Sequence, residues 1–199
     1  MIVYRSLVLS SAVIVLVTGC AAEKNAATPS DPPTTAPTPS TTPSSTPEVL
    51  GMPAVCADLL PTSRLDAFAG DGLVLLGGPD GLYGDDYLID QTPEQEAGGI
   101  TCIWGPPDTE ISTVTVSIAP LDASSRASTI ASLTEQGLNE DVDGDAVYYW
   151  LQGDTDSQPA VVNVLRNDSW ISVIETVGGI DLYDEAEAIA VEAHDLAYS

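Results

Sequence analysis

The chain has 199 residues, with 30 Asp and Glu against 5 Lys and Arg and a single His, so its formal net charge is −25 at pH 7. Nucleic-acid binding requires Lys and Arg to neutralise phosphates, and anionic lipid surfaces attract basic segments in the same way. The charge therefore excludes nucleic acid as a partner. The negative charge is explained by solubility and by electrostatic repulsion between copies of the chain. The alternative explanation is a preference for cations and basic partners.

An apolar run near the amino terminus predicts a lipoprotein signal peptide. The run covers residues 7–17, follows Arg5 and ends just before Gly19 and Cys20. Secretory signals have a basic start, an apolar core of about 7–15 residues and small residues at the cleavage point, whereas a bilayer span needs about 20 apolar residues. We expect 1–19 to be the signal peptide and Cys20 to be acylated. The alternative is an ordinary cleaved signal with an incidental cysteine.

The composition changes sharply between the expected anchor and the rest of the chain. Residues 20–49 are rich in Pro, Thr, Ser and Ala, which cannot bury enough apolar surface to fold, so a disordered tether is predicted. Residues 50–199 are enough for one domain with its own core. Acylation at Cys20 would hold this domain outside the cell, on the outer face of the cell membrane.

The first half of the domain is expected to hold one helix and two paired strands. Apolar spacing predicts a helix at 57–69 and a short strand at 73–76, followed by a long acidic, glycine-rich surface loop at 77–99. Alternating apolar residues then predict strands at 100–105 and 112–119, which we expect to pair as antiparallel neighbours.

The second half again begins with a helix that strands follow, and it ends with a closing helix. An amphipathic helix is expected at 124–137, strands at 146–151, 160–166 and 170–177, and a closing helix at 181–198. This order is typical of an α+β domain. We expect a single, mostly antiparallel sheet of about five strands with the helices packed on one face.

The three cysteines divide into one lipid site and one pair. If Cys20 carries lipid, Cys56 and Cys102 remain as an even pair in an oxidising compartment, where disulfides persist. A Cys56–Cys102 bridge is therefore predicted. The alternative, a metal or reactive thiol pair, is poorly supported because the sequence has no Cys-x-x-Cys motif.

Two short motifs resemble those of a known family. Residues 56–60 read Cys-Ala-Asp-Leu-Leu, and Cys102 is followed by Ile and then by Trp104. This arrangement resembles a family of actinobacterial secreted lipoproteins of unknown function, with Cys-x-x-Leu-Leu on a first helix and Cys-x-Trp on the first main strand. The resemblance implies that the bridge pins the first helix to the sheet with Trp104 beside it. It implies no catalytic residue.

An acidic segment in the second half contains candidate calcium ligands. Ca²⁺ prefers several carboxylate oxygens that converge from a loop, and Asp141, Asp143 and Asp145 could supply them. The EF-hand spacing fails, because Ala146 stands where glycine is due and Gln152 where glutamate is due. The alternative interpretation is a polar turn before the next strand. We predict no cofactor.

Aromatic residues on one predicted strand form a candidate binding surface. Tyr148, Tyr149 and Trp150 are consecutive, and side chains along a strand alternate between the two faces of the sheet. One face could therefore present aromatic rings to a partner or a ligand. The alternative is ordinary packing beneath the helices.

No motif for catalysis is found. His194 is the only histidine and falls on the flank of the last predicted helix, and Lys24, the only lysine, lies in the tether. A Ser-Lys or Schiff-base mechanism is therefore excluded from the domain. Paired carboxylates of a glycosidase remain open, since nothing singles out two of the acids.

These observations predict a cell-envelope lipoprotein that works by binding. We expect a monomeric, non-catalytic accessory module that takes a small ligand or an envelope protein, with the membrane contacted through the lipid anchor. Two alternatives stay open. One is a carboxylate-dependent envelope hydrolase, and the other is a lipid carrier with an apolar cavity.

Overall fold

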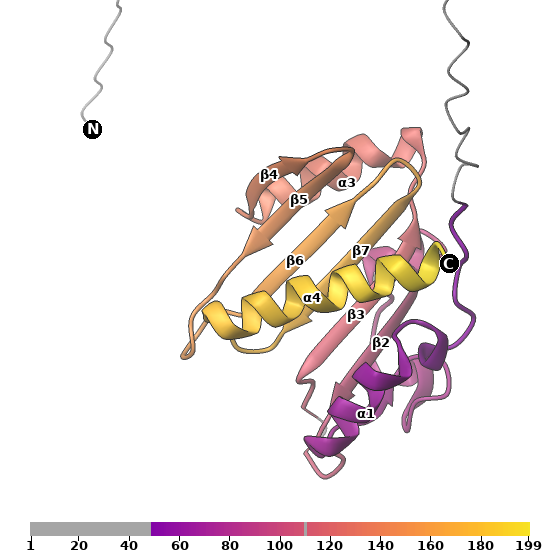
Figure 1. The fold of residues 1–199 in the computed structure, drawn as a ribbon, viewed down its shortest axis with the longest axis vertical. Coiled ribbons are helices and arrows are strands. Elements are labelled where there is room, and N and C mark those ends of the chain that lie inside the picture. The colour runs from indigo at the N-terminus through magenta and orange to yellow at the C-terminus, as the bar shows by residue number, and fades with distance from the viewer. Residues whose placement is uncertain (1–48, 110) are drawn as a thin grey trace, which may run out of the picture. The chain divides into compact units, whose positions relative to one another are not determined.

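The computed structural model describes residues 49–109 and 111–199, so Cys20, the expected signal peptide and most of the expected tether lie outside the described residues. In the described part, seven strands form one antiparallel sheet in the order β1-β2-β3-β7-β6-β5-β4 (Figure 1). The strands are β1 (Val74–Gly77), β2 (Ile100–Gly105), β3 (Val114–Pro120), β4 (Asn139–Asp143), β5 (Ala146–Leu151), β6 (Ala160–Leu165) and β7 (Ser169–Glu175). The α-helices are α1 (Thr62–Gly70), α2 (Pro93–Glu96), α3 (Ala123–Glu135) and α4 (Ile180–Ala197), and the short 3-10 helices are η1 (Cys56–Asp58) and η2 (Gly84–Tyr87).

The α+β class and the antiparallel sheet are as expected, but the number of strands is not. The prediction of about five strands is wrong because two further strands join the sheet: β1, near the short strand expected at 73–76, pairs with β2, and β4, a strand of acidic residues, forms a hairpin with β5. Its acids disfavour strand formation in isolation. The turn after Asp143 begins with Gly144 at φ 62°, a conformation that glycine adopts without steric cost and that suits a two-residue hairpin.

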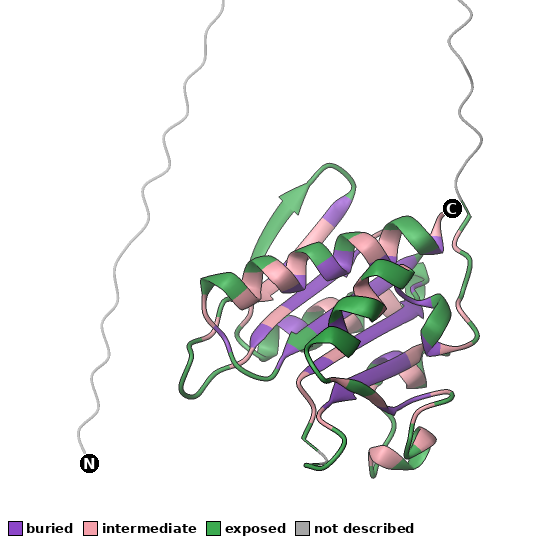
Figure 2. Ribbon diagram, turned by 60° about the horizontal axis from the view of Figure 1, so that its bottom comes forward, coloured by how far each residue is buried: buried purple, intermediate pink, exposed green. Residues whose placement is uncertain are grey.

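Helices cover both faces of the sheet, so the prediction that they pack on one face is also wrong. Helix α4 crosses one face in front of β6 and β7, and α3 lies behind the sheet (Figure 1). Neighbouring residues on a strand point to opposite faces. Accordingly, Val164 belongs to the core under α4, whereas the next residue, Leu165, packs with Leu133 of α3. The central strands are buried along almost their whole length, which requires cover on both sides (Figure 2).

Helix α4 packs on the sheet through a stripe of buried side chains, most of which are alanine. This stripe consists of Ala186, Ile189, Ala190, Ala193 and Ala197, all of them buried. Alanine side chains let the helix axis approach the sheet closely. In the part of the chain that the structure describes, no helix combines the length and the apolar character needed to cross a membrane.

The segment 77–99 is more ordered than the predicted surface loop. It contains η2 and α2, and α2 begins with a capping box between Thr92 and Gln95. The Thr92 hydroxyl also lies 2.7 Å from the hydroxyl of Thr101 on β2, which is hydrogen-bonded in turn to Ser117 on β3. A short polar network therefore fixes α2 against the sheet, on the face opposite α4.

The Cys56–Cys102 disulfide predicted from the cysteine count is present. It joins η1 to β2. The helix expected at 57–69 is split around Pro61 into η1 and α1, and Cys56 lies in η1. Trp104 is buried two residues after Cys102, and its ring centroid lies 5.3 Å from that of Phe68 on α1. The bridge and this aromatic pair together hold the start of the domain on the sheet.

Removal of the disulfide is expected to destabilise the domain strongly. The bridge closes a loop with a sequence separation of 46 residues, which corresponds to about 4 kcal/mol on the chain-entropy estimate. Replacement of Cys56 and Cys102 together by Ser should lower the free energy of unfolding by an amount of this order, measured by urea denaturation. An equal denaturation midpoint in the variant and the wild type would contradict this role.

Candidate functional site

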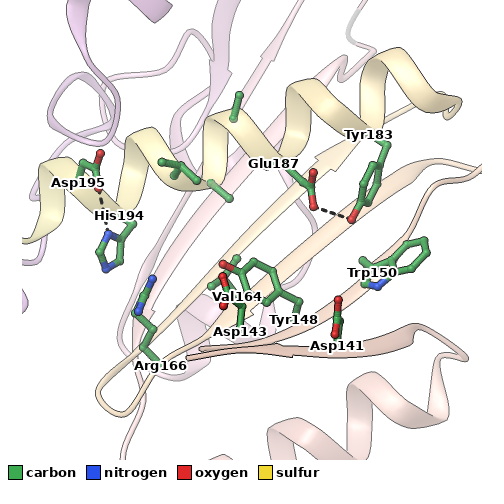
Figure 3. A pocket seen from close by; sticks show the side chains of 13 residues that line it. Asp141, Asp143, Tyr148, Trp150, Val164, Arg166, Tyr183, Glu187, His194 and Asp195 are labelled. Carbon is green, nitrogen blue, oxygen red and sulfur yellow. Dashed lines mark hydrogen bonds and ion pairs between the residues drawn. The ribbon is translucent and has the colours of Figure 1, made fainter. Parts of the chain in front are cut away.

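A groove of about 510 Å³ lies between α4 and the end of the sheet formed by β4, β5 and β6 (Figure 3). Its floor is made by Tyr148 and Trp150 of β5 and Val164 of β6. Helix α4 forms one wall, and β4 forms the opposite rim. The groove exists because α4 packs over β6 and β7 and leaves β4 and β5 uncovered on this face.

The strand register places the floor and the rim in rows. Asp141 of β4 pairs with Tyr148 of β5, which pairs with Val164 of β6. Paired residues share a face of an antiparallel sheet, and so do residues two apart on one strand. Trp150 and Asp143 therefore lie on the same face as this row. Both strands of the β4–β5 hairpin thus direct side chains toward α4.

The wall contributed by α4 is a second stripe, separate from the one buried in the core. Tyr183, Glu187, Val191 and His194 recur at intervals of four, four and three residues, which places them on one side of the helix. The Tyr183 hydroxyl donates a 2.7 Å hydrogen bond to the Glu187 carboxylate. The Tyr183 ring centroid lies 5.3 Å from that of Trp150, so the wall meets the floor at this end through two aromatic rings.

One end of the groove is negatively charged. The pKa of the Tyr183 hydroxyl is raised, first by burial, then by its hydrogen bond to Glu187, and further by the negative charges of Glu187, Asp184 and Asp141. Asp141 lies on β4 and Glu187 on α4, so acidic groups act on Tyr183 from both sides of the groove. Any ligand bound here meets this negative potential.

The opposite end holds Arg166 and His194, and a carboxylate lies beside each of them. Arg166 Nη1 lies 2.7 Å from Asp145 Oδ1, and His194 Nδ1 lies 3.2 Å from Asp195 Oδ1. Among the described residues, Asp143 has no hydrogen bond or ion pair through its side chain, and the Asp141 carboxylate accepts only from the backbone N–H of Val142. Within the described part of the chain, no basic side chain therefore forms an ion pair with these two acids at the rim.

The structure brings together only part of the predicted calcium candidates. Asp141 and Asp143 both line the groove, but Asp145 lies in the β4–β5 turn and is paired with Arg166. Within residues 49–109 and 111–199, no group of three or more His, Cys, Asp or Glu side chains is placed to hold a metal ion. The described residues thus offer no assembled site for calcium.

The three candidate aromatic residues separate between the two faces. Tyr148 and Trp150 form the groove floor, half-buried. Tyr149 is only 2% exposed and packs against α3 on the opposite face, where its hydroxyl donates to Glu140. Tyr149 is therefore excluded from this surface, and a binding role on this face falls to its two neighbours.

Sequence reasoning did not identify the residues that α4 contributes. Tyr183, Glu187 and Val191 recur every four residues, and this spacing is a visible sign of a shared helix side. The sequence does not indicate that this side faces the β4–β5 hairpin, because that depends on where α4 crosses the sheet. His194, predicted to lie on a helix flank, does line the groove.

Two buried acids lie outside the groove, on opposite faces of the sheet. Glu175 is 2% exposed on the α4 face of β7, and Glu94 is 7% exposed on α2 beside Ser172, on the opposite face. Burial raises the pKa of both, that of Glu175 to about 8, with Glu185 raising it further and Arg64 lowering it. Because the sheet separates these two carboxyl groups, they cannot act on one bond, and neither of them lines the groove.

The buried carboxyl of Glu175 makes stability depend on pH. Its pKa in the folded state, about 8, lies above the ordinary value of 4.5, so the contribution of this group to stability is fully present below pH 4.5 and is lost as the pH rises toward 8. The difference amounts to roughly 3–5 kcal/mol. Glu175→Gln should remove this loss, so that the variant exceeds the wild type in free energy of unfolding at pH 8, measured by urea denaturation.

A matched control is Asp108→Asn, which removes a charge at an exposed position. It should follow the wild-type dependence on pH. Parallel curves for Glu175→Gln and the wild type across pH 4.5–8 would show that the Glu175 carboxyl is not buried as described.

Comparison with protein-family models, with curated proteins and with solved structures finds no match for this chain.

Proposed function

We propose that the chain is a membrane-anchored, extracytoplasmic binding module of the cell envelope, and that it holds its ligand in the groove between α4 and the β4–β5 hairpin. One observation carries this proposal. Four residues singled out in the sequence as ligands or binding surface, Asp141, Asp143, Tyr148 and Trp150, line one cavity of about 510 Å³. Small-molecule sites commonly measure about 300–1,000 Å³ and combine apolar walls with a few polar groups.

The location outside the cell rests on the amino-terminal sequence and on the cysteines. The apolar run and the small residues before Cys20 are typical of a lipoprotein signal. The Cys56–Cys102 bridge supports the same location, because disulfides persist in oxidising compartments. The resemblance to secreted lipoproteins agrees with both observations.

The competing functions are less well supported by the side chains. A hydrolase with two carboxylates needs an acid of raised pKa beside a second carboxylate in one cleft, whereas Glu94 and Glu175, the two buried acids whose pKa is raised, lie on opposite faces of the sheet and outside the groove. A lipid carrier needs a wholly apolar cavity, whereas Asp141, Asp143 and Glu187 line the groove. Packing acyl chains against these carboxylates would cost free energy, because charged groups lose their hydration there.

Acylation of Cys20 is the first prediction. The full chain, expressed in its host and labelled with an alkyne analogue of palmitate, should carry the label, and Cys20→Ser should lose it because the acceptor sulfur is absent. Mass spectrometry of the amino-terminal peptide should find a chain that begins at Cys20. An unlabelled wild-type chain, or one that begins elsewhere, would contradict the anchor.

Occupancy of the groove is the second prediction. Native mass spectrometry of the full chain, purified from its host in a mild detergent, should detect a co-purifying molecule. Trp150→Ala should lose that molecule, because half of the aromatic contact at the floor is removed. Ile111→Ala, which truncates an exposed apolar side chain outside the groove, should retain it. An empty wild-type chain, or a ligand unaffected by Trp150→Ala, would contradict the proposal.

A further inference from the structure

Two aromatic rings of the groove meet at one end of it. Trp150 and Tyr183 lie there with their ring centroids 5.3 Å apart, and Tyr148 lies on the floor of the same groove (Figure 3). The faces of aromatic rings attract cations electrostatically, and tryptophan does so most strongly. A positively charged group near these rings would therefore be stabilised, provided that no cation of the protein already occupies the position.

Among the described residues, no Lys or Arg side chain lines that end of the groove. Arg166 and His194 lie at the other end of the groove, where each is paired with its own carboxylate (Figure 3). Asp141 and Glu187 lie close to the aromatic rings, one on β4 and one on α4. An anionic ligand would be repelled at this end, and a neutral ligand would gain little from the two carboxylates. A cation gains from both the rings and the acids.

The nature of the cation follows from the size and the donor set of the groove. Within the described residues, no set of three or more His, Cys, Asp or Glu is placed to hold a metal ion. The cavity, about 510 Å³, is far larger than a metal ion needs and fits a small organic molecule. The half-buried floor of Tyr148 and Trp150 suits apolar substituents around the charge.

We infer that the ligand of the groove is a small organic cation, in which an ammonium group with apolar substituents lies against the paired rings of Trp150 and Tyr183 and faces Asp141 and Glu187. This inference rests on the proposed function of the groove and specifies the chemical class of its ligand. The Glu187 carboxylate also accepts from the Tyr183 hydroxyl, which positions the ring and the charge together.

The test compares two probes of the same shape that differ in charge. Choline carries a trimethylammonium group, and 3,3-dimethylbutan-1-ol replaces its nitrogen by carbon. Titrated into the full mature chain in a neutral detergent and followed by NMR chemical shifts of the tryptophan indole N–H groups, choline should bind roughly 3- to 30-fold more tightly than the alcohol. Its binding should weaken as salt is added. Equal affinity for the two probes, or no binding of choline, overturns the inference.

Variants that each remove one carboxylate charge test which acids attract the bound cation. Asp141→Asn and Glu187→Gln keep the shape of each side chain and remove its charge, and each should weaken choline binding several-fold without affecting the alcohol. Asp108→Asn removes an exposed charge outside the groove and should leave choline binding unchanged. Circular dichroism establishes that each variant folds. If all three variants weaken choline binding equally, the effect comes from the net charge of the protein. That result would overturn the assignment of the cation to the groove.

The outcomes separate this inference from the proposed function. A neutral or anionic molecule that co-purifies with the chain and is lost on Trp150→Ala overturns the cationic ligand and leaves the binding function standing. If the purified chain carries no molecule and choline does not bind, both fail. Choline binding that depends on Asp141, Glu187 and Trp150 supports both.

Discussion

The position of α4 on the sheet decides what this chain can do. A stripe of alanines with Ile189 packs the helix onto β6 and β7, while Arg64 of α1 forms ion pairs with Glu185 and Glu192 on the same helix. The sheet continues for two more strands beyond this contact, so one side of α4 faces the β4–β5 hairpin across open space. The groove is a consequence of this offset, and its wall is the side of α4 next to the buried stripe, with Ala190 common to both.

The acidic composition has a specific role at this edge of the sheet. Strand β4 is exposed along its length (Figure 2), and charged residues on an edge strand discourage pairing with other chains. The same acids supply the rim of the groove, where Asp141 and Asp143 point toward α4. Protection of the edge and recognition of a cation can therefore share the same residues. This interpretation links the net charge of −25 to a particular surface.

The sequence predicted those parts of the structure that depend on local patterns. Short apolar segments between turn residues placed β2, β3 and β5–β7, with clear alternation in β3, and cysteine counting identified the bridge from Cys56 to Cys102. Strand β4 was missed because its residues are acidic, although the Gly-Asp turn before Ala146 is a recognised hairpin signal. The helix wall of the groove and the split of the helices between two faces depend on contacts distant in the sequence. Local sequence patterns do not indicate where α4 crosses the sheet.

The most direct test is a crystal structure of the full mature chain purified from its host. We expect α4 to lie over β6 and β7, with electron density for an organic cation against the paired rings of Trp150 and Tyr183. A helix shifted onto β5, so that its own side chains fill the groove, would contradict the proposed site. So would a groove that is open but contains only solvent.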